Sequence, residues 1–314
     1  MYILLIAKVV RITMACDTFS SEAANNLLGG KFICIFGGSN IRSLYKDLIW
    51  LLEDGRLSSE TMLKTKNEES HSNDIRLSNG PLHNGIHYEE VREYNRNCHI
   101  TFQFITRLYQ TNFIDFIKSI ETLSKVPDVV IINSCLWDLT RWGTTGIQQF
   151  KKNVFDTLTY LQSCWRSTRI IWLTAAPLAF QCYGGMLAEH NGYVRKSLPW
   201  HVLFANNYAA NVANSLNIDV LDLHYYFRFL MNYQVKDGIH WMPLTVRFAV
   251  NLLLTHIASV WSVKLPGVSV LSRRFLIEST RLNILPLYQS EVKNNIRRRR
   301  RRRCRNFNRN RYYI

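Results

Sequence analysis

Apolar and polar residues follow two different rhythms along this chain. Five short runs are almost wholly apolar, as buried strands are, and they occupy residues 31–36, 99–105, 128–133, 169–176 and 218–223. Longer segments lie between them, and their apolar residues recur every three or four positions, as on one face of a helix. These segments are residues 40–55, 111–123, 147–164, 203–216 and 243–261. We therefore expect strands and helices to alternate.

This alternation predicts an α/β fold. Apolar strands that are separated by helices usually pair in parallel, and the helices then cover both faces of the sheet. The sequence thus predicts a five-stranded parallel sheet. Ligands of such sheets bind beyond the carboxyl ends of the strands, so residues that directly follow a strand are the first candidates for chemistry.

The pattern also predicts how the chain is divided. Residues 1–30 are expected to be a disordered leader or an extra strand, because Lys8 and Arg11 interrupt the apolar start and no basic segment precedes it, unlike in a signal peptide. Residues 31–266 are the predicted folded domain, and 267–314 a disordered basic tail. No segment is expected to span a membrane. Residues 55–98 are polar, and we expect this long insertion to close over the substrate.

Composition and charge narrow the picture further. Hydrophobic residues make up 47% of the chain, which excludes a mainly disordered protein. The net charge of +16 is uneven, because residues 291–314 hold eleven basic residues against Glu291. The arginines between 297 and 311 favour contact with nucleic acid or another polyanion, or nuclear import. A solvated tail with only non-specific polyanion affinity is the alternative.

The cysteines and histidines do not indicate a metal site. The seven cysteines are odd in number, irregularly spaced and without a CxxC pair, so we expect free thiols in a reducing compartment. The predicted location is therefore intracellular, either cytoplasmic or nuclear. His83 and His87 lie four apart, but Gly85 between them argues against a helix and no third ligand has the right spacing. No metal and no organic cofactor are expected.

The segment FICIFGGSNIRSLYKD contains the first candidate for catalysis. A buried strand runs through Gly37 and Gly38 onto Ser39, and a helical pattern follows. Either the glycines make a turn and Ser39 caps the helix, or Ser39 is presented as a nucleophile. Its place just beyond the carboxyl end of the first strand favours the nucleophile.

The segment VKDGIHWMP supplies a candidate base. Asp237 precedes His240 by three residues, with a glycine between them. In a turn, this carboxylate can hold the Nδ1–H of the imidazole and leave Nε2 to face a serine. On its own, so short a pattern would be better explained by a surface turn, but the segment also lies at the carboxyl edge of the sheet, at the same end as the Gly-Gly-Ser unit. We therefore expect Ser39, His240 and Asp237 to act together.

An oxyanion needs hydrogen-bond donors as well. The backbone N–H of Ser39, at a helix N-terminus, is one. The segment NSCLWDLTRWG offers the side-chain amide of Asn133 as a second, although Asn133 could equally cap the strand. Asp138 is expected to hold this loop, and Trp137 or Trp142 to wall the pocket.

Together these motifs resemble a known superfamily. The order Gly-x-Ser, Asn-x-x-x-x-Asp and Asp-x-x-His is similar to that of the SGNH or GDSL-type hydrolases. More narrowly, SLYKDLIWLL, LHNGIHYEEVREY, FITRLY, DVVIINSCLWDLTRWG, VLDLHYYFR and DGIHWMP resemble the PC-esterase domain-containing proteins, over about residues 31–266. The resemblance implies a flavodoxin-like three-layer α/β/α sandwich and a hydrolase of acyl esters. It assigns Ser39 as nucleophile, His240 as base and Asp237 as its partner.

One departure keeps other functions open. The family has Gly-Asp-Ser where this chain has Gly37-Gly38-Ser39, so an aspartate that braces the nucleophile loop is missing. Glycine adds backbone freedom, which works against preorganisation. A catalytically weakened protein that binds or scaffolds is therefore the second hypothesis. A nuclear or RNA-associated protein that acts through its arginine tail is the third.

Overall fold

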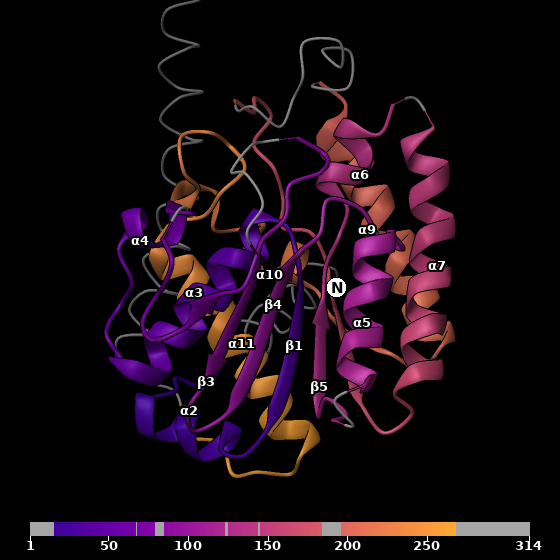
Figure 1. Ribbon diagram of the computed structural model, residues 1–314. Coiled ribbons are helices and arrows are strands. Elements are labelled where there is room, and N and C mark those ends of the chain that lie inside the picture. The colour runs from indigo at the N-terminus through magenta and orange to yellow at the C-terminus, as the bar shows by residue number, and fades with distance from the viewer. Residues whose placement is uncertain are drawn as a thin grey trace, which may run out of the picture.

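A seven-stranded sheet forms the centre of the computed structural model (Figure 1), which describes residues 16–267 except 67, 79–84, 123–124, 144 and 184–195. The strand order is β2-β3-β4-β1-β5-β6-β7. The strands are β1 (Phe32–Gly37), β2 (Ile75–Arg76), β3 (Val91–Asn95), β4 (His99–Phe104), β5 (Val129–Ile132), β6 (Arg169–Leu173) and β7 (Asp219–Leu221).

The five predicted strands form the parallel part of this sheet. Strands β4, β1, β5, β6 and β7 are parallel to one another, with β1 between β4 and β5. Every residue of β1 is buried, which explains why its sequence is a continuous apolar run rather than an alternating one. The predicted α/β fold with five parallel strands is confirmed, and two antiparallel strands extend it at one edge.

Helices cover both faces of the sheet. Helices α2, α3 and α11 pack on one face, while α5, α7 and α9 pack on the other (Figure 1). The helices are α2 (Ser21–Leu28), α3 (Ser39–Glu53), α4 (Glu60–Lys64), α5 (Thr111–Thr122), α6 (Leu136–Arg141), α7 (Gly146–Cys164), α9 (Leu198–Ser215), α10 (Leu223–Phe227), the 3₁₀ turn η2 (Met231–Tyr233) and α11 (Pro243–Val260). The five predicted helices are therefore present, although α9 begins at Leu198 rather than at residue 203.

Helix α11 combines the length and the apolar composition of a membrane span. Its mean hydropathy is 1.3, but 61% of it is buried inside the domain. It packs against α3, and residues such as Val250, Leu253 and Leu254 are wholly removed from solvent. Burial in the core explains the apolar composition of this helix.

The folded domain begins earlier than the sequence predicted. Helix α2 starts after Ser20, whose hydroxyl accepts a hydrogen bond from the Ala23 N–H at 3.1 Å. Ala24 and Leu28 of this helix are fully buried in the core shared with α3. The packed part of the chain thus begins before residue 31. The rest of the predicted leader, residues 1–15, and the predicted tail from 268 onward lie outside the described residues.

The insertion at 55–98 contains regular structure that its polar sequence did not indicate. Strand β3 is antiparallel to β4, and β2 pairs with β3. The described residues of the insertion include fully buried charges, among them Glu90 and Arg92. Arg92 Nε donates to Asp74 Oδ2 at 2.8 Å. Because paired charges replace apolar residues on one side of β3, the strand lacks an apolar alternation.

This ionic cluster holds the insertion against α3. Arg42, one turn after Ser39, donates to Glu90 Oε2 at 2.9 Å and is almost fully buried. The hydroxyl of Tyr88 donates to the same carboxylate oxygen at 2.6 Å. The described residues of the insertion thus extend the sheet beside the nucleophile helix. His83 of the predicted histidine pair lies outside them.

Candidate active site

Ser39 lies where the central strand meets a long helix. Strand β1 ends at Gly37, Gly38 is the N-cap, and Ser39 is the first residue of α3. A Cβ atom on Gly37 would lie 2.5 Å from Cγ1 of Ile41, so the tight turn into the helix admits only glycine there. This geometry puts the Ser39 hydroxyl at the carboxyl edge of the sheet and its N–H at a helix N-terminus.

His240 faces Ser39, although the two residues lie 201 positions apart in the sequence. Its Nε2 lies 2.7 Å from Ser39 Oγ. The loop that carries it depends on Gly238, which has a φ of +73° and whose Cβ would lie 2.7 Å from the carbonyl oxygen of Gln181. The glycine between Asp237 and His240 is therefore needed both for the left-handed turn and for the close approach of the neighbouring chain.

Asp237 orients the imidazole. Its Oδ2 lies 2.7 Å from His240 Nδ1, and its Oδ1 accepts the backbone N–H groups of Ile239 and His240, each at 2.9 Å. Burial tends to raise the pKa of this carboxyl, but the hydrogen bonds from the His240 ring and from the two N–H groups outweigh burial and lower it. The carboxylate is thus charged near neutral pH and fixes the ring with Nε2 toward Ser39.

Asn40 ties the two halves of this arrangement together, and the sequence analysis did not identify it. Its Nδ2 donates to the carbonyl oxygen of Ile239 at 3.2 Å, which links the first turn of α3 to the His240 loop. The only signal in the sequence is its position next to Ser39.

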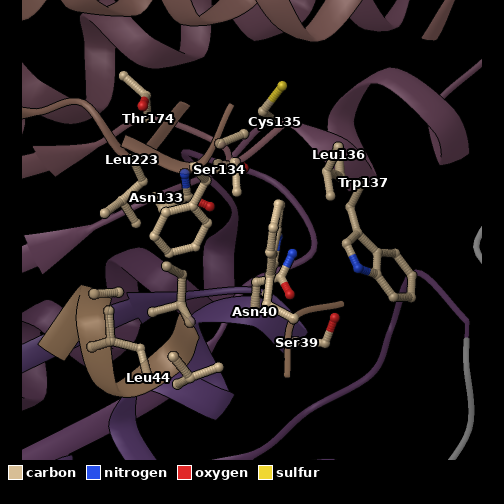
Figure 2. A pocket seen from close by; sticks show the side chains of 18 of the residues that line it. Ser39, Asn40, Leu44, Asn133, Ser134, Cys135, Leu136, Trp137, Thr174 and Leu223 are labelled. Atoms are coloured by element: carbon tan, nitrogen blue, oxygen red, sulfur yellow. The ribbon is translucent and has the colours of Figure 1, made fainter. Parts of the chain in front are cut away.

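Asn133 does not lie beside Ser39. Figure 2 shows its side chain on the far side of the cavity, close to Ser134 and Leu223. Its Nδ2 donates to the carbonyl oxygen of Leu173 at 2.8 Å, across β5 and β6. This geometry fits the strand-end alternative and does not support the predicted role as an oxyanion donor.

Asp138 lies in α6, the short helix that follows β5, and its side chain reaches back to the loop between the two elements, as expected of a residue that holds this segment. Its Oδ2 accepts a hydrogen bond from the Ser134 hydroxyl, and the carboxyl is almost fully buried. Burial raises its pKa to about 7, although the bond from Ser134 acts in the opposite direction. Both tryptophans of this segment, Trp137 in α6 and Trp142 at its end, lie at the same edge of the sheet. The indole of Trp142 donates to the Thr106 carbonyl at 3.2 Å, and Trp137 lies against Gly38.

An apolar cavity of about 60 Å³ opens beside Ser39. It extends between α3, α10 and α11, and its apolar walls include Ile41, Leu44, Leu223, Phe227, Trp241 and Val246 (Figure 2). A void needs only about 10–15 Å³ of this kind of volume to hold one water molecule, so the space suits a small apolar group. Among the described residues, no three His, Cys, Asp or Glu side chains are grouped so that they could hold a metal ion.

Comparison with known proteins finds close relatives in sequence. The chain is 36% identical over 255 residues to PC-esterase domain-containing protein 1A of Homo sapiens, covering 79% of this chain and 56% of that protein. It is 35% identical over 252 residues to PC-esterase domain-containing protein 1B of Homo sapiens, covering 78% and 58%. The chain thus spans little more than half the length of these relatives. No protein-family model matches it.

Solved structures resemble the chain more distantly. The lipase/acylhydrolase from Enterococcus faecalis is 12% identical, with a TM-score of 0.46 and coverage of 73% of this chain and 96% of that one. A peptidoglycan O-acetylesterase is 11% identical, with a TM-score of 0.46 and coverage of 78% and 98%. Likeness of this degree says nothing about the chemistry of the chain.

Proposed function

We propose that this chain, which belongs to the family of the PC-esterase domain-containing protein 1 homologues, is a serine hydrolase that cleaves ester bonds. One observation carries the proposal. Ser39 Oγ, His240 Nε2, His240 Nδ1 and Asp237 Oδ2 form a continuous chain of hydrogen bonds, each 2.7 Å long. This is the arrangement that a nucleophile, a base and an orienting carboxylate require.

The reaction proceeds through an acyl-enzyme. Ser39 Oγ bonds to the carbonyl carbon of the ester while its proton passes to His240 Nε2, and Asp237 stabilises the resulting imidazolium. The carbon–oxygen bond to the leaving alcohol then breaks, and His240 returns the proton to that alcohol. Water, deprotonated by His240, attacks the acyl carbon and releases a carboxylic acid and free Ser39. The apolar cavity beside Ser39 receives the acyl group.

The same geometry favours catalysis over the second hypothesis, a binding or scaffold protein. In the first turn of α3, Asn40 holds the base loop to the nucleophile helix through Ile239. The serine and the histidine are therefore positioned although the aspartate that the family has before the serine is replaced by Gly38. A preorganised nucleophile and base are what the weakened alternative would lack.

Labelling with a fluorophosphonate tests the proposal. We expect the purified wild-type chain to be labelled to one equivalent and Ser39→Ala not at all. Ser43→Ala is the matched control, because Ser43 lies one turn along α3 and its hydroxyl donates to the Ser39 carbonyl at 3.1 Å. It should keep its label. Absence of labelling in folded wild-type protein would refute the hydrolase.

A second variant separates a triad from an isolated reactive serine. Asp237→Asn removes the charge that stabilises the imidazolium and favours the wrong tautomer of His240. For p-nitrophenyl acetate we expect kcat to fall by about 10³–10⁴, as in other serine triads. An unchanged kcat would show that Asp237 does not orient the base.

A further inference from the structure

We infer that the indole N–H of Trp137 is the second donor of the oxyanion hole, beside the backbone N–H of Ser39. This inference rests on the proposed function, since an oxyanion forms only if Ser39 attacks a carbonyl. The tetrahedral intermediate needs donors aimed at the charge that develops on the former carbonyl oxygen. The Ser39 N–H, at the start of α3, is one, and a side chain must supply another from a neighbouring element.

The two amides near the site have other partners. Asn133 Nδ2 donates to the Leu173 carbonyl at 2.8 Å and lies on the far side of the cavity from Ser39 (Figure 2). Asn40 Nδ2 donates to the Ile239 carbonyl at 3.2 Å. Both amides therefore serve to hold strands and loops together.

The indole of Trp137 is placed differently. A Cβ atom on Gly38 would lie 3.7 Å from Trp137 Nε1 and 3.5 Å from its Cδ1, so the nitrogen-bearing edge of the ring lies directly over the residue before Ser39. Trp137 and Ser39 line the same cavity, and Figure 2 shows the ring nitrogen on the edge that is turned toward Ser39. Within the described part of the chain, the Trp137 N–H has no hydrogen-bond partner.

The ring is held in place from two sides. Its edge-to-face contact with Phe104 has a centroid separation of 5.9 Å and an interplanar angle of 89°. On another side, the Arg141 guanidinium carbon lies 5.5 Å from the ring centroid. A cation at the face of an indole draws electron density from it, which makes the N–H a stronger donor. An oriented donor of this kind does not need to reorganise when the negative charge forms.

Gly38 leaves this edge of the indole uncovered. A bare Cβ at this position would make only ordinary contact with Trp137, at 3.5–3.7 Å, whereas a carboxylate extended from it would reach the indole N–H. The replacement of the family's aspartate by glycine is then not simply the loss of a brace. It leaves the indole N–H open to a substrate oxygen.

Trp137→Phe tests the inference, since it removes the indole N–H and keeps a smaller aromatic ring beside Phe104. With p-nitrophenyl acetate, we expect kcat to fall by about 10²–10³ with little change in KM, the cost of losing one oxyanion donor. Trp142→Phe is the matched control, because Trp142, at the end of the same helix, does not line the cavity and its indole N–H is already bonded to the Thr106 carbonyl. Its kcat should change by less than about threefold, which is under 1 kcal/mol.

Two further measurements keep the outcomes distinct. Fluorophosphonate labelling carried to completion counts competent Ser39 sites, so kcat per labelled site is independent of partial unfolding of a variant. A wild-type chain that labels and turns over, with an equal kcat per site in Trp137→Phe, would overturn the inference and leave the hydrolase standing. A wild-type chain that neither labels nor turns over would overturn both.

Discussion

Ser39, His240 and Asp237 were identified from short motifs because each motif carries its own geometry. The turn into α3 needs glycine at position 37 because of the close approach of Ile41, and the turn at Gly238 needs a positive φ. Such backbone requirements leave marks in the sequence. The structure brings the two turns together, with Ser39 Oγ 2.7 Å from His240 Nε2.

A substitution of Gly38 tests whether a negative charge beside the proposed oxyanion hole lowers activity. Its φ of −84° admits any residue, and a Cβ there would meet Trp137 and Phe104 only at ordinary contact distances. Gly38→Asp should therefore fold. Its carboxylate would accept the Trp137 N–H and place a negative charge beside the developing oxyanion. We expect kcat for p-nitrophenyl acetate to fall by about tenfold or more, which corresponds to about 1.4 kcal/mol.

Gly38→Ala is the control for Gly38→Asp, because it adds the same Cβ without the charge and should stay close to wild type. A variant Gly38→Asp that is more active than wild type would contradict this expectation. If activity appeared only in that variant, the natural chain would be the weakened binding protein of the second hypothesis.

Donor roles could not be predicted in the same way. A side-chain amide in the sequence gives no indication of which carbonyl it faces, and Asn133 faces Leu173 through the pairing of β5 with β6. The edge of a tryptophan is set by its neighbours from other elements, here Phe104 and Arg141. These contacts are long-range products of the fold, so only the structure could show them.

At the scale of elements, the sequence predicted the helices and strands whose apolar residues recur at a regular spacing. It did not predict strand β3, which buries charged residues. Strand β3 and the chain that leads to it carry Glu90 and Arg92, both fully buried, and Arg92 is paired with both Glu90 and Asp74. Buried charges persist only where partners offset their desolvation. Some of these partners, such as Arg42 for Glu90, come from distant positions, so the sequence alone predicted a polar loop here.

The buried carboxyl of Asp138 in α6 makes the stability of the fold depend on pH. Folding raises the pKa of Asp138 to about 7, chiefly by burial. Between about pH 4 and pH 7 the folded chain therefore binds a proton that the unfolded chain releases, so the free energy of unfolding falls as pH rises through this range. Asp138→Asn lacks this dependence. Its stability relative to wild type should rise between pH 4 and pH 8, by a few kcal/mol at most.

Denaturant unfolding of wild type and Asp138→Asn at several pH values measures this difference. Asp115→Asn is the control, because Asp115 is an exposed carboxyl on α5. A difference between Asp138→Asn and wild type that does not change with pH would show that Asp138 titrates in the folded chain as it does when unfolded.

At the scale of the whole molecule, one edge of the sheet brings together the candidate site residues from segments far apart in sequence. Ser39 follows β1, α6 with Trp137 follows β5, and the His240 loop precedes α11. The parallel topology that the apolar runs predicted is what brings these segments to one place. The topology of the sheet says nothing about the arginine tail, because the tail lies outside the described residues. Its predicted role in binding rests on charge alone.

The tail hypothesis makes a separate prediction. Residues 291–314 carry eleven basic residues, whereas the rest of the chain is only moderately basic. For single-stranded RNA such as poly(U), replacing the arginines at 297–303 by glutamine should weaken binding and flatten its dependence on log salt by up to about 5. Fluorophosphonate labelling of Ser39 should remain unchanged, since the triad lies in the folded domain. Equal affinity and an equal salt slope in the two chains would place the RNA contact elsewhere and refute a binding role for the tail.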